Sequence, residues 1–83
     1  MRVLYFAWVR EAVGADEEQV APPAHVATVA DLISWLSGRS DGHARAFADR
    51  SRLRAAVDQA FVGLDASVAD ATEVAIFPPV TGG

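Results

Sequence analysis

The sequence predicts an α+β fold in which a small mixed sheet packs on one main helix. Two observations support this prediction: strand-like apolar alternation near both ends of the chain, and a capped helical pattern between them. At 83 residues the chain is long enough for one small core, so we expect a single domain.

The first elements are expected to be two strands. Arg2–Val9 is rich in aromatic and β-branched residues and alternates two apolar sets, which predicts a strand with both faces apolar. Gly14 predicts a turn. Glu17–Ala21 is then expected to return as a second strand that ends at Pro22-Pro23.

The main helix is marked at both ends. Thr28 followed by Asp31 resembles a capping box, and Gly38 predicts the end of the element. Apolar residues lie between these signals at helical spacing: Val29, Leu32, Ile33 and Leu36.

The remaining elements are shorter. Gly42–Asp49 is expected to form a helical turn, Leu53–Val57 and Gln59–Val62 two short strands, and Glu73–Phe77 the last strand. The resulting order, β-β-α-β-β-β with one long helix, is that of the β-grasp or ubiquitin-like arrangement.

One face of such a sheet is left without a helix. If Val3, Tyr5, Val74 and Ile76 face the helix, the other apolar set shares the open face: Leu4, Phe6, Trp8 and Phe77. Exposed apolar patches of this kind usually mark a partner surface. The alternative is that residues 38–52 cover this face.

The chain ends in Pro78-Pro79-Val80-Thr81-Gly82-Gly83, which predicts a flexible tail (78–83) after a β-grasp domain (1–77). The prolines favour an extended path and give the tail a reach of about 20 Å. Glycine lets its backbone pass through a channel too narrow for side chains. The tail therefore indicates a terminus that presents its carboxylate, with a frayed, solvated end as the alternative.

Composition excludes several classes of function. With 11 acidic residues against 7 arginines and a pI near 4.8, the protein is not expected to bind nucleic acid. It has no cysteine for metal, disulfide or thiol chemistry, and no lysine to which its own activated end could be joined. The apolar start is too short for a signal peptide or membrane span, so we expect a cytoplasmic protein without a membrane partner.

No catalytic or metal-binding constellation is apparent in the sequence. His25 and His43 lack metal-ligand spacing and are expected at the surface, and Asp16–Glu18 is expected to be a solvated strand edge. Trp35 is expected to flank the core. One further group of residues is basic: Arg45, Arg50, Arg52 and Arg54. It is either a solvated surface or a docking patch for an acidic partner.

Five segments of the sequence match a known pattern: Val3–Ala7, Val9–Glu11, Val13–Gly14, Ala56–Gln59 and, above all, Glu73–Gly83. Together they resemble the family of molybdopterin synthase small subunits, which are ubiquitin-like sulfur carriers. The resemblance runs from end to end, and the Phe-Pro-Pro-Val-Thr-Gly-Gly ending is its most specific part.

The resemblance implies a chemistry centred on Gly83. An activating enzyme similar to those of ubiquitin adenylates this glycine, which is then converted to a thiocarboxylate and inserted into the large subunit. There the sulfur passes to a cyclic pyranopterin precursor in molybdenum cofactor biosynthesis. By matched position, Gly82 threads the channel, and the following residues contact partners: Phe6, Arg10, Phe61, Phe77, Pro78, Pro79, Val80 and Thr81.

The resemblance also implies that the chain alone is not an enzyme. No cofactor is bound permanently; AMP and sulfur are attached to Gly83 only transiently, and the ATP and pterin pockets belong to the partners. The implied complex with the large subunit is a heterotetramer.

Two alternatives remain at this point. One is another β-grasp carrier, for thiamine biosynthesis or for protein conjugation, although the Pro-Pro-containing ending favours the molybdopterin carrier. The other is a ubiquitin-like interaction module, in which Gly82 and Gly83 would be dispensable.

Overall fold

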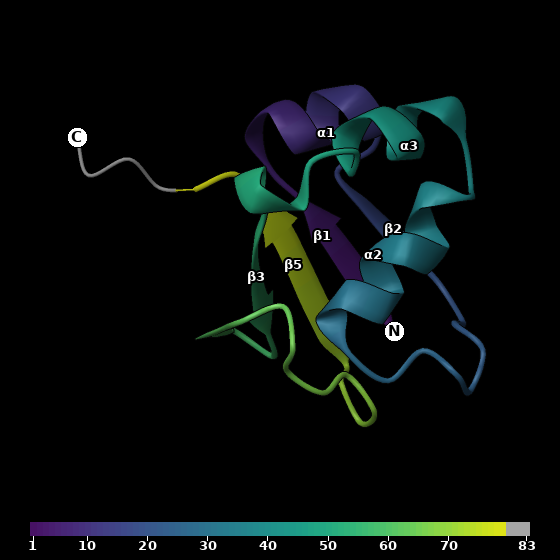
Figure 1. Ribbon diagram of the computed structural model, residues 1–83, viewed down its shortest axis with the longest axis vertical. Helices are drawn as coiled ribbons and strands as arrows, with labels where there is room; N and C mark the ends of the chain where they lie inside the picture. Colours follow the sequence, from purple (N-terminus) through teal and green to yellow (C-terminus); the bar gives the residue numbers. More distant parts are fainter. Residues whose placement is uncertain (80–83) are drawn as a thin grey trace.

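The computed structural model describes residues 1–79, and within them it confirms the α+β architecture (Figure 1). The boundary expected at Phe77 between domain and tail remains a prediction, because Val80, Thr81, Gly82 and Gly83 lie outside the described residues. The elements in chain order are β1 (Arg2–Tyr5), α1 (Ala7–Val13), β2 (Glu17–Gln19), α2 (Val29–Ser37), α3 (Asp41–Ala46), the 3₁₀ helix η1 (Arg50–Arg52), β3 (Arg54–Val57), β4 (Ala60–Val62) and β5 (Glu73–Phe77).

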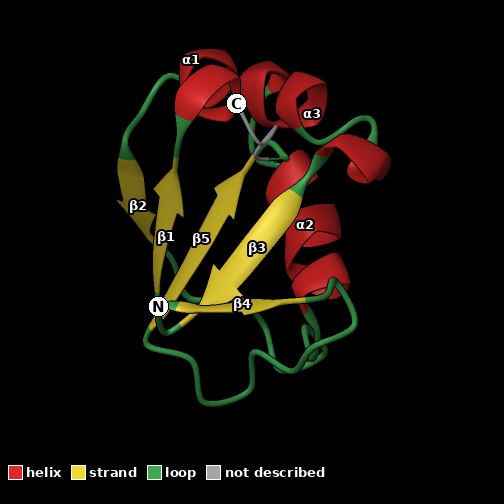
Figure 2. Cartoon of the chain, turned by 90° about the vertical axis from the view of Figure 1, so that its left-hand side faces the viewer, coloured by secondary structure: helices red, strands yellow, loops and turns green. Residues whose placement is uncertain are grey.

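The strands of residues 1–79 form one mixed sheet in the order β2-β1-β5-β3-β4 (Figure 2). Its centre is the parallel pair β1 and β5, in which Val3 lies opposite Val74 and Tyr5 opposite Ile76. The other neighbouring strands are antiparallel. Two strands from opposite ends of the chain therefore form the middle of the sheet.

Helix α2 begins and ends where the sequence predicts. The side chain of Thr28 accepts a hydrogen bond from the Asp31 backbone at 3.1 Å, and the Asp31 carboxylate accepts one from the Thr28 backbone at 3.2 Å. Hydrogen bonds from the Ala27 and Thr28 backbone hold the pKa of Asp31 below its ordinary value, because they favour the ionised carboxylate. Gly38 caps the other end.

The core lies between α2 and one face of the sheet. The predicted helix-facing residues are confirmed: Val3, Val74 and Ile76 are 0% exposed and Tyr5 is 1% exposed. The apolar stripe of α2 is also fully buried: Val29, Leu32, Ile33 and Leu36. Strand alternation and helical spacing thus bring together the two surfaces that the sequence predicts.

The prediction of a single strand over Arg2–Val9 is wrong. β1 ends at Tyr5, Phe6 is still extended, and Ala7 has a φ of 53°, which breaks the strand and starts α1. As a result Val9 turns inward and is fully buried, and α1 ends at Gly14 with a φ of 89°. The apolar residues after Phe6 are apolar because they cover the end of the sheet, not because they continue a strand.

Other boundaries differ by small amounts. The second strand stops at Gln19, earlier than the expected Ala21. The helical turn expected over residues 42–49 is helix α3, which Ser40 caps by accepting a hydrogen bond from the His43 backbone.

A Cβ on Gly42 would collide with the carbonyl oxygen of Ala12, so this glycine allows α1 and α3 to pack closely.

His43 is buried, so its expected position at the surface is wrong, whereas His25 is exposed as expected. The Nε2 atom of His43 lies 2.6 Å from Glu18 Oε1, and its Nδ1 atom lies 2.7 Å from Ser40 Oγ. The hydroxyl of Tyr5 donates to the same Glu18 oxygen at 2.8 Å. These hydrogen bonds satisfy the polar atoms that packing has removed from water.

The acidic edge strand is therefore only partly a solvated edge. Asp16 and Glu17 are exposed, whereas Glu18 points to the buried His43 and Tyr5. Burial alone would raise the pKa of Glu18, but hydrogen bonds from His43 and Tyr5 hold this pKa below its ordinary value. Burial, together with the hydrogen bond to Glu18, raises the pKa of Tyr5.

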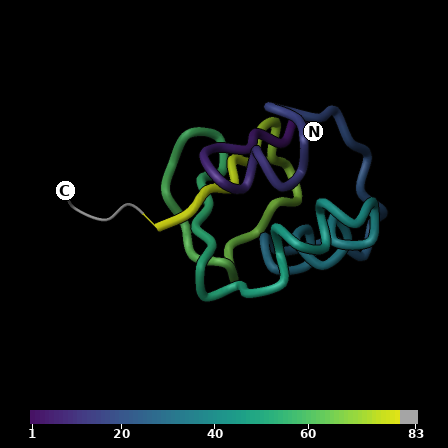
Figure 3. The backbone as a smooth tube through the Cα atoms, turned by 90° about the horizontal axis from the view of Figure 1, so that it is seen from above, coloured from purple at the N-terminus to yellow at the C-terminus, as the bar shows by residue number. Residues whose placement is uncertain are grey.

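The helices of residues 1–79 are short, and none of them has the length and apolar character needed to cross a bilayer. Viewed from above, the chain's described end leaves the molecule on the side away from α2 (Figure 3). The final residues of β5 thus point to a part of the surface that the main helix does not occupy.

We predict that Ile76→Ala lowers the free energy of unfolding by about 2 to 5 kcal/mol, because it removes buried methylene groups and leaves a cavity beneath α2. Urea denaturation followed by circular dichroism measures this loss. Phe61→Ala is the matched control, because Phe61 is 83% exposed and its truncation leaves no core cavity. An unchanged midpoint for Ile76→Ala would show that β5 does not turn this side chain into the core.

We predict that Glu18 makes the stability fall in acid. Its folded-state pKa is below the unfolded value, so its contribution is present above the ordinary pKa of 4.5 and is lost as the pH falls through the folded pKa. Glu18→Gln keeps a side-chain oxygen for Tyr5 and His43 but cannot titrate. Denaturation midpoints from pH 7 to pH 3 should therefore decline less steeply in this variant. Equal slopes in both proteins would contradict the prediction.

Candidate functional site

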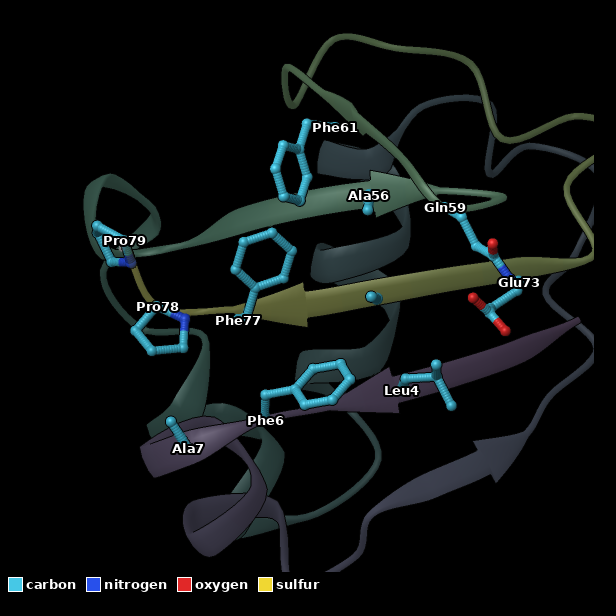
Figure 4. A pocket seen from close by; sticks show the side chains of 11 residues that line it. Leu4, Phe6, Ala7, Ala56, Gln59, Phe61, Glu73, Phe77, Pro78 and Pro79 are labelled. Atoms are coloured by element: carbon cyan, nitrogen blue, oxygen red, sulfur yellow. The ribbon is translucent and has the colours of Figure 1, made fainter. Parts of the chain in front are cut away.

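The open face of the sheet carries an apolar groove of about 510 Å³ beside the end of β5 (Figure 4). The groove is lined by residues of four strands, the start of α1, the β3–β4 turn and the two prolines after β5: Leu4, Phe6, Ala7, Ala56, Gln59, Phe61, Glu73, Ala75, Phe77, Pro78 and Pro79. It lies where β5 passes into the final residues of the chain.

Small and large residues alternate between the floor and the walls of the groove. Ala75 of β5 lies opposite Ala56 of β3, and both are only 8% exposed. Phe61 of β4 and Phe77 of β5 stand above them with ring centroids 5.8 Å apart. Small side chains on the central strands thus leave a hollow that the aromatic rings border.

The groove exposes aromatic surface to water. Phe61 is 83% exposed and Phe6 is 46% exposed, and these are the large hydrophobic residues with high exposure in residues 1–79. Transfer of such a side chain out of water is favourable by about 1.5 to 3 kcal/mol. An exposed aromatic cluster of this kind is typical of a surface that another protein covers.

The hairpin that carries Phe61 turns tightly at Asp58-Gln59. Both residues adopt positive φ, 48° and 73°, as a two-residue turn between β3 and β4 requires. The Oδ1 atom of Asp58 also accepts hydrogen bonds from the backbone of Thr72 and Glu73, each at 3.0 Å. Asp58 therefore joins the hairpin to the start of β5. Because the hairpin carries Phe61, these hydrogen bonds also hold one wall of the groove in place.

Most of the described candidate residues come together in this groove. Phe6, Phe61, Phe77, Pro78 and Pro79 line it. Arg10 does not: it lies exposed on α1, 3.9 Å from Asp16. The candidates Val80, Thr81, Gly82 and Gly83 fall outside the described residues.

The expectation that Trp8 shares the open face is wrong. Trp8 lies on α1, packs partly against the core, and has the Arg52 guanidinium 4.8 Å from its ring centroid. The alternation of the last strand puts Ala75 on the face of Phe77, as the structure confirms. The sequence reasoning gave Ala56, the other residue of the groove floor, no place on this face.

The described lining of the groove is mostly apolar and has few groups for acid-base, nucleophilic or metal chemistry. Among the described residues that line it, Glu73 is the one carboxylate, and it pairs with Arg2. Residues 1–79 contain no group of three or more His, Cys, Asp or Glu side chains arranged to hold a metal ion. What the described residues offer is an exposed apolar groove at the end of β5.

A mixed β-grasp sheet packed on one main helix defines the class of ubiquitin-like proteins. Residues 3–83 match the ThiS family. The molybdopterin synthase sulfur carrier subunit of Escherichia coli is 47% identical over all of this chain and 99% of the relative. That of Haemophilus influenzae is 35% identical over the same shares of the two chains.

Solved structures agree with these sequence relatives. A Pyrococcus furiosus protein assigned as molybdopterin converting factor, subunit 1, superposes with a TM-score of 0.73 at 32% identity, covering 95% of each chain. SAMP1 from Haloferax volcanii superposes with a TM-score of 0.72 at 27% identity, covering 100% of this chain and 98% of the other. The chain therefore belongs to the ThiS family, among the molybdopterin synthase sulfur carrier subunits, which act in molybdenum cofactor biosynthesis.

We predict that Asp58→Ala lowers the free energy of unfolding by about 1 to 3 kcal/mol, because it removes the acceptor of two backbone hydrogen bonds and places alanine at positive φ. Asp58→Asn is the matched control, since asparagine tolerates positive φ and keeps a side-chain oxygen. Thermal and urea unfolding of the two variants measure the difference. Equal losses in both would contradict this role of the Asp58 acceptor.

Proposed function

We propose that Gly83 carries the sulfur as a thiocarboxylate and that the apolar groove binds the large subunit of molybdopterin synthase. The observation that carries this proposal is the groove at the base of a Gly-Gly ending that the family match includes, through residue 83. The groove would provide affinity, and the tail would provide the reacting group.

The proposed chemistry starts from the carboxylate of Gly83, which is a poor electrophile. An activating adenylyltransferase would join it to AMP from ATP and release pyrophosphate, which gives the carbonyl carbon a good leaving group. A sulfur nucleophile would then displace AMP and leave a thiocarboxylate. The thiocarboxylate sulfur is nucleophilic and would attack the pterin precursor without a cysteine in this chain. Water would then hydrolyse the acyl–sulfur bond, which leaves the sulfur on the pterin and restores the carboxylate of Gly83.

The base of the tail is suited to delivery. Phe77 is the last residue of β5 and one wall of the groove, so a partner that covers the groove also fixes where the tail begins. Pro78 and Pro79 restrict φ to an extended path, and residues 78–83 can reach about 20 Å. Gly82 would let the backbone pass through a narrow channel.

The partners follow from this division of labour. The large subunit would hold the pterin precursor, form a heterotetramer with the carrier, and supply the catalytic groups. Arg10, exposed on α1, and Val80 and Thr81 in the tail are proposed as further partner contacts. AMP and sulfur would be bound only in transit, and the reactions would take place in the cytoplasm.

We predict that Phe77→Ala or Phe61→Ala raises the Kd for the large subunit about 30-fold, since truncation of an aromatic anchor costs about 2 kcal/mol of binding. Isothermal titration calorimetry measures the affinity, with circular dichroism to verify folding. Trp35→Ala is the control, because Trp35 is an aromatic residue of α2, away from the groove. Unchanged affinity in both phenylalanine variants would place the large subunit elsewhere.

We predict that deletion of Gly83 abolishes charging and that Gly82→Ala impairs it, whereas both variants fold. The deletion displaces the reacting carboxylate by one residue. The methyl group of alanine would clash with the walls of a channel that fits bare backbone. Each variant is incubated with activating enzyme, ATP and a sulfur source, and intact mass reveals the exchange of oxygen for sulfur.

The matched control for Gly82→Ala is Gly38→Ala, where a Cβ would make only an ordinary contact with the Trp35 carbonyl oxygen. This variant should charge normally. A chain without Gly83 that still charges and still supports dithiolene formation would exclude Gly83 as the carrier.

A further inference from the structure

The charges of this chain are strongly segregated. Residues 39–54 contain five arginines against two aspartates, a formal charge of +3, while the rest of the chain has two arginines against nine acidic residues, or −7. An acidic protein thus contains one continuous basic segment. This segregation is not needed for the fold, because exposed charges contribute little to stability.

The fold places the end of this basic segment beside the groove. η1 lies at the same end of the sheet as the end of β5, next to the last described residues (Figure 1). Arg54 lies opposite Phe77 in the pairing of β3 with β5. Arg54 also borders a second small hollow together with Phe61 and Phe77, the same two rings that form the wall of the groove.

Two exposed arginines at this end of the sheet, Arg52 and Arg54, are held in place without forming an ion pair within residues 1–79. The Nη1 atom of Arg54 donates to the carbonyl oxygens of Leu53 at 2.8 Å and Ser51 at 3.2 Å. The guanidinium of Arg52 lies over the ring of Trp8. Within residues 1–79, neither Arg52 nor Arg54 has a carboxylate within 4.0 Å of its guanidinium, whereas Arg2, Arg10 and Arg39 each do.

These contacts organise positive charge without neutralising it. Backbone carbonyls and an aromatic ring orient a guanidinium but carry no formal negative charge. Less side-chain entropy is then lost when a carboxylate binds, because the rotamer is already restricted. Such an arrangement suits an arginine that meets an acidic group on another molecule.

We propose that Arg52 and Arg54 form a basic rim of the groove that contacts an acidic surface on the large subunit of molybdopterin synthase. This inference rests on the proposed function, which assigns the groove to that subunit. Arg54 makes the rim continuous with the groove, because it shares a hollow with Phe61 and Phe77, and Arg52 lies two residues earlier in the chain, over Trp8 of α1. A protein that covers the two rings therefore meets Arg54 first. A nucleic acid fits less well, because the rest of the chain, at −7, repels a polyanion.

The expected role of the rim is to speed and orient association. Complementary charges at the edge of an interface act mainly on the association rate, and salt screens them. The apolar groove would determine how long the complex persists. The two surfaces should therefore be separable in kinetic measurements.

The test is stopped-flow association of the double variant Arg52→Gln/Arg54→Gln with purified large subunit. We expect the association rate to fall about tenfold at about 50 mM salt and less than about twofold at about 500 mM, with the dissociation rate nearly unchanged. Arg52→Lys/Arg54→Lys keeps both charges and should keep most of the rate. Thermal unfolding verifies that all variants are folded.

A matched control separates local charge from net charge. Ala24→Glu/Ala69→Glu changes the net charge by the same amount, at two exposed loop residues outside the groove and the rim. This control should associate within about twofold of the unchanged protein. An equal loss of association rate in the control, or no loss in the glutamine variant, would overturn the proposal that the rim contacts the large subunit.

Two further outcomes are informative. If the unchanged protein charges with sulfur but the glutamine variant associates normally, only the rim is wrong; if the unchanged protein neither charges nor binds the large subunit, the proposed function fails. A single-stranded RNA oligonucleotide that binds through the two arginines, with association to the large subunit unaffected, would overturn the rim in favour of nucleic acid.

Discussion

The alternation of side chains along the central strands β1 and β5 is the constraint on which the rest of the structure depends. Because neighbouring residues point to opposite faces, Val74 and Ile76 enter the core while Ala75 and Phe77 face outward. A shift of one residue in the register would exchange these sets. The same short strand therefore supplies both buried core residues and part of the lining of the groove.

The sequence predicted those parts of the fold whose signals are local. The capped helix α2 and the strand Glu73–Phe77 appear where their patterns lie. Helix α1 was missed because Phe6, Trp8 and the residues between them continue the strand alternation, and the break at Ala7 has no glycine or proline to mark it. The reason why Val9 is apolar is visible only in the folded structure, where it is buried as α1 covers the end of the sheet.

The candidate site shows the same limit. Phe6 and Phe77 could be predicted because strand periodicity assigns them to one face, whereas Phe61 was expected in the site only from the family resemblance. The partnership of His43 with Glu18 could not, because 25 residues separate them and neither has a sequence pattern that requires the other. The basic segment was visible in the sequence, but only the pairing of Arg54 with Phe77 places it beside the groove.

The parallel pairing of β1 with β5 also affects the order in which the protein can be made. Arg2 contacts Glu73 across 71 residues of sequence, so the sheet gains its centre only after nearly the whole chain has left the ribosome. Closing so long a loop makes this a late step of folding. Residues 78–83 follow β5 directly, so this last pairing also brings the start of the tail to the sheet. A chain that stops before Glu73 lacks the central strand β5 and its partner contacts with β1 and β3, so it cannot close the sheet and stays open to proteases.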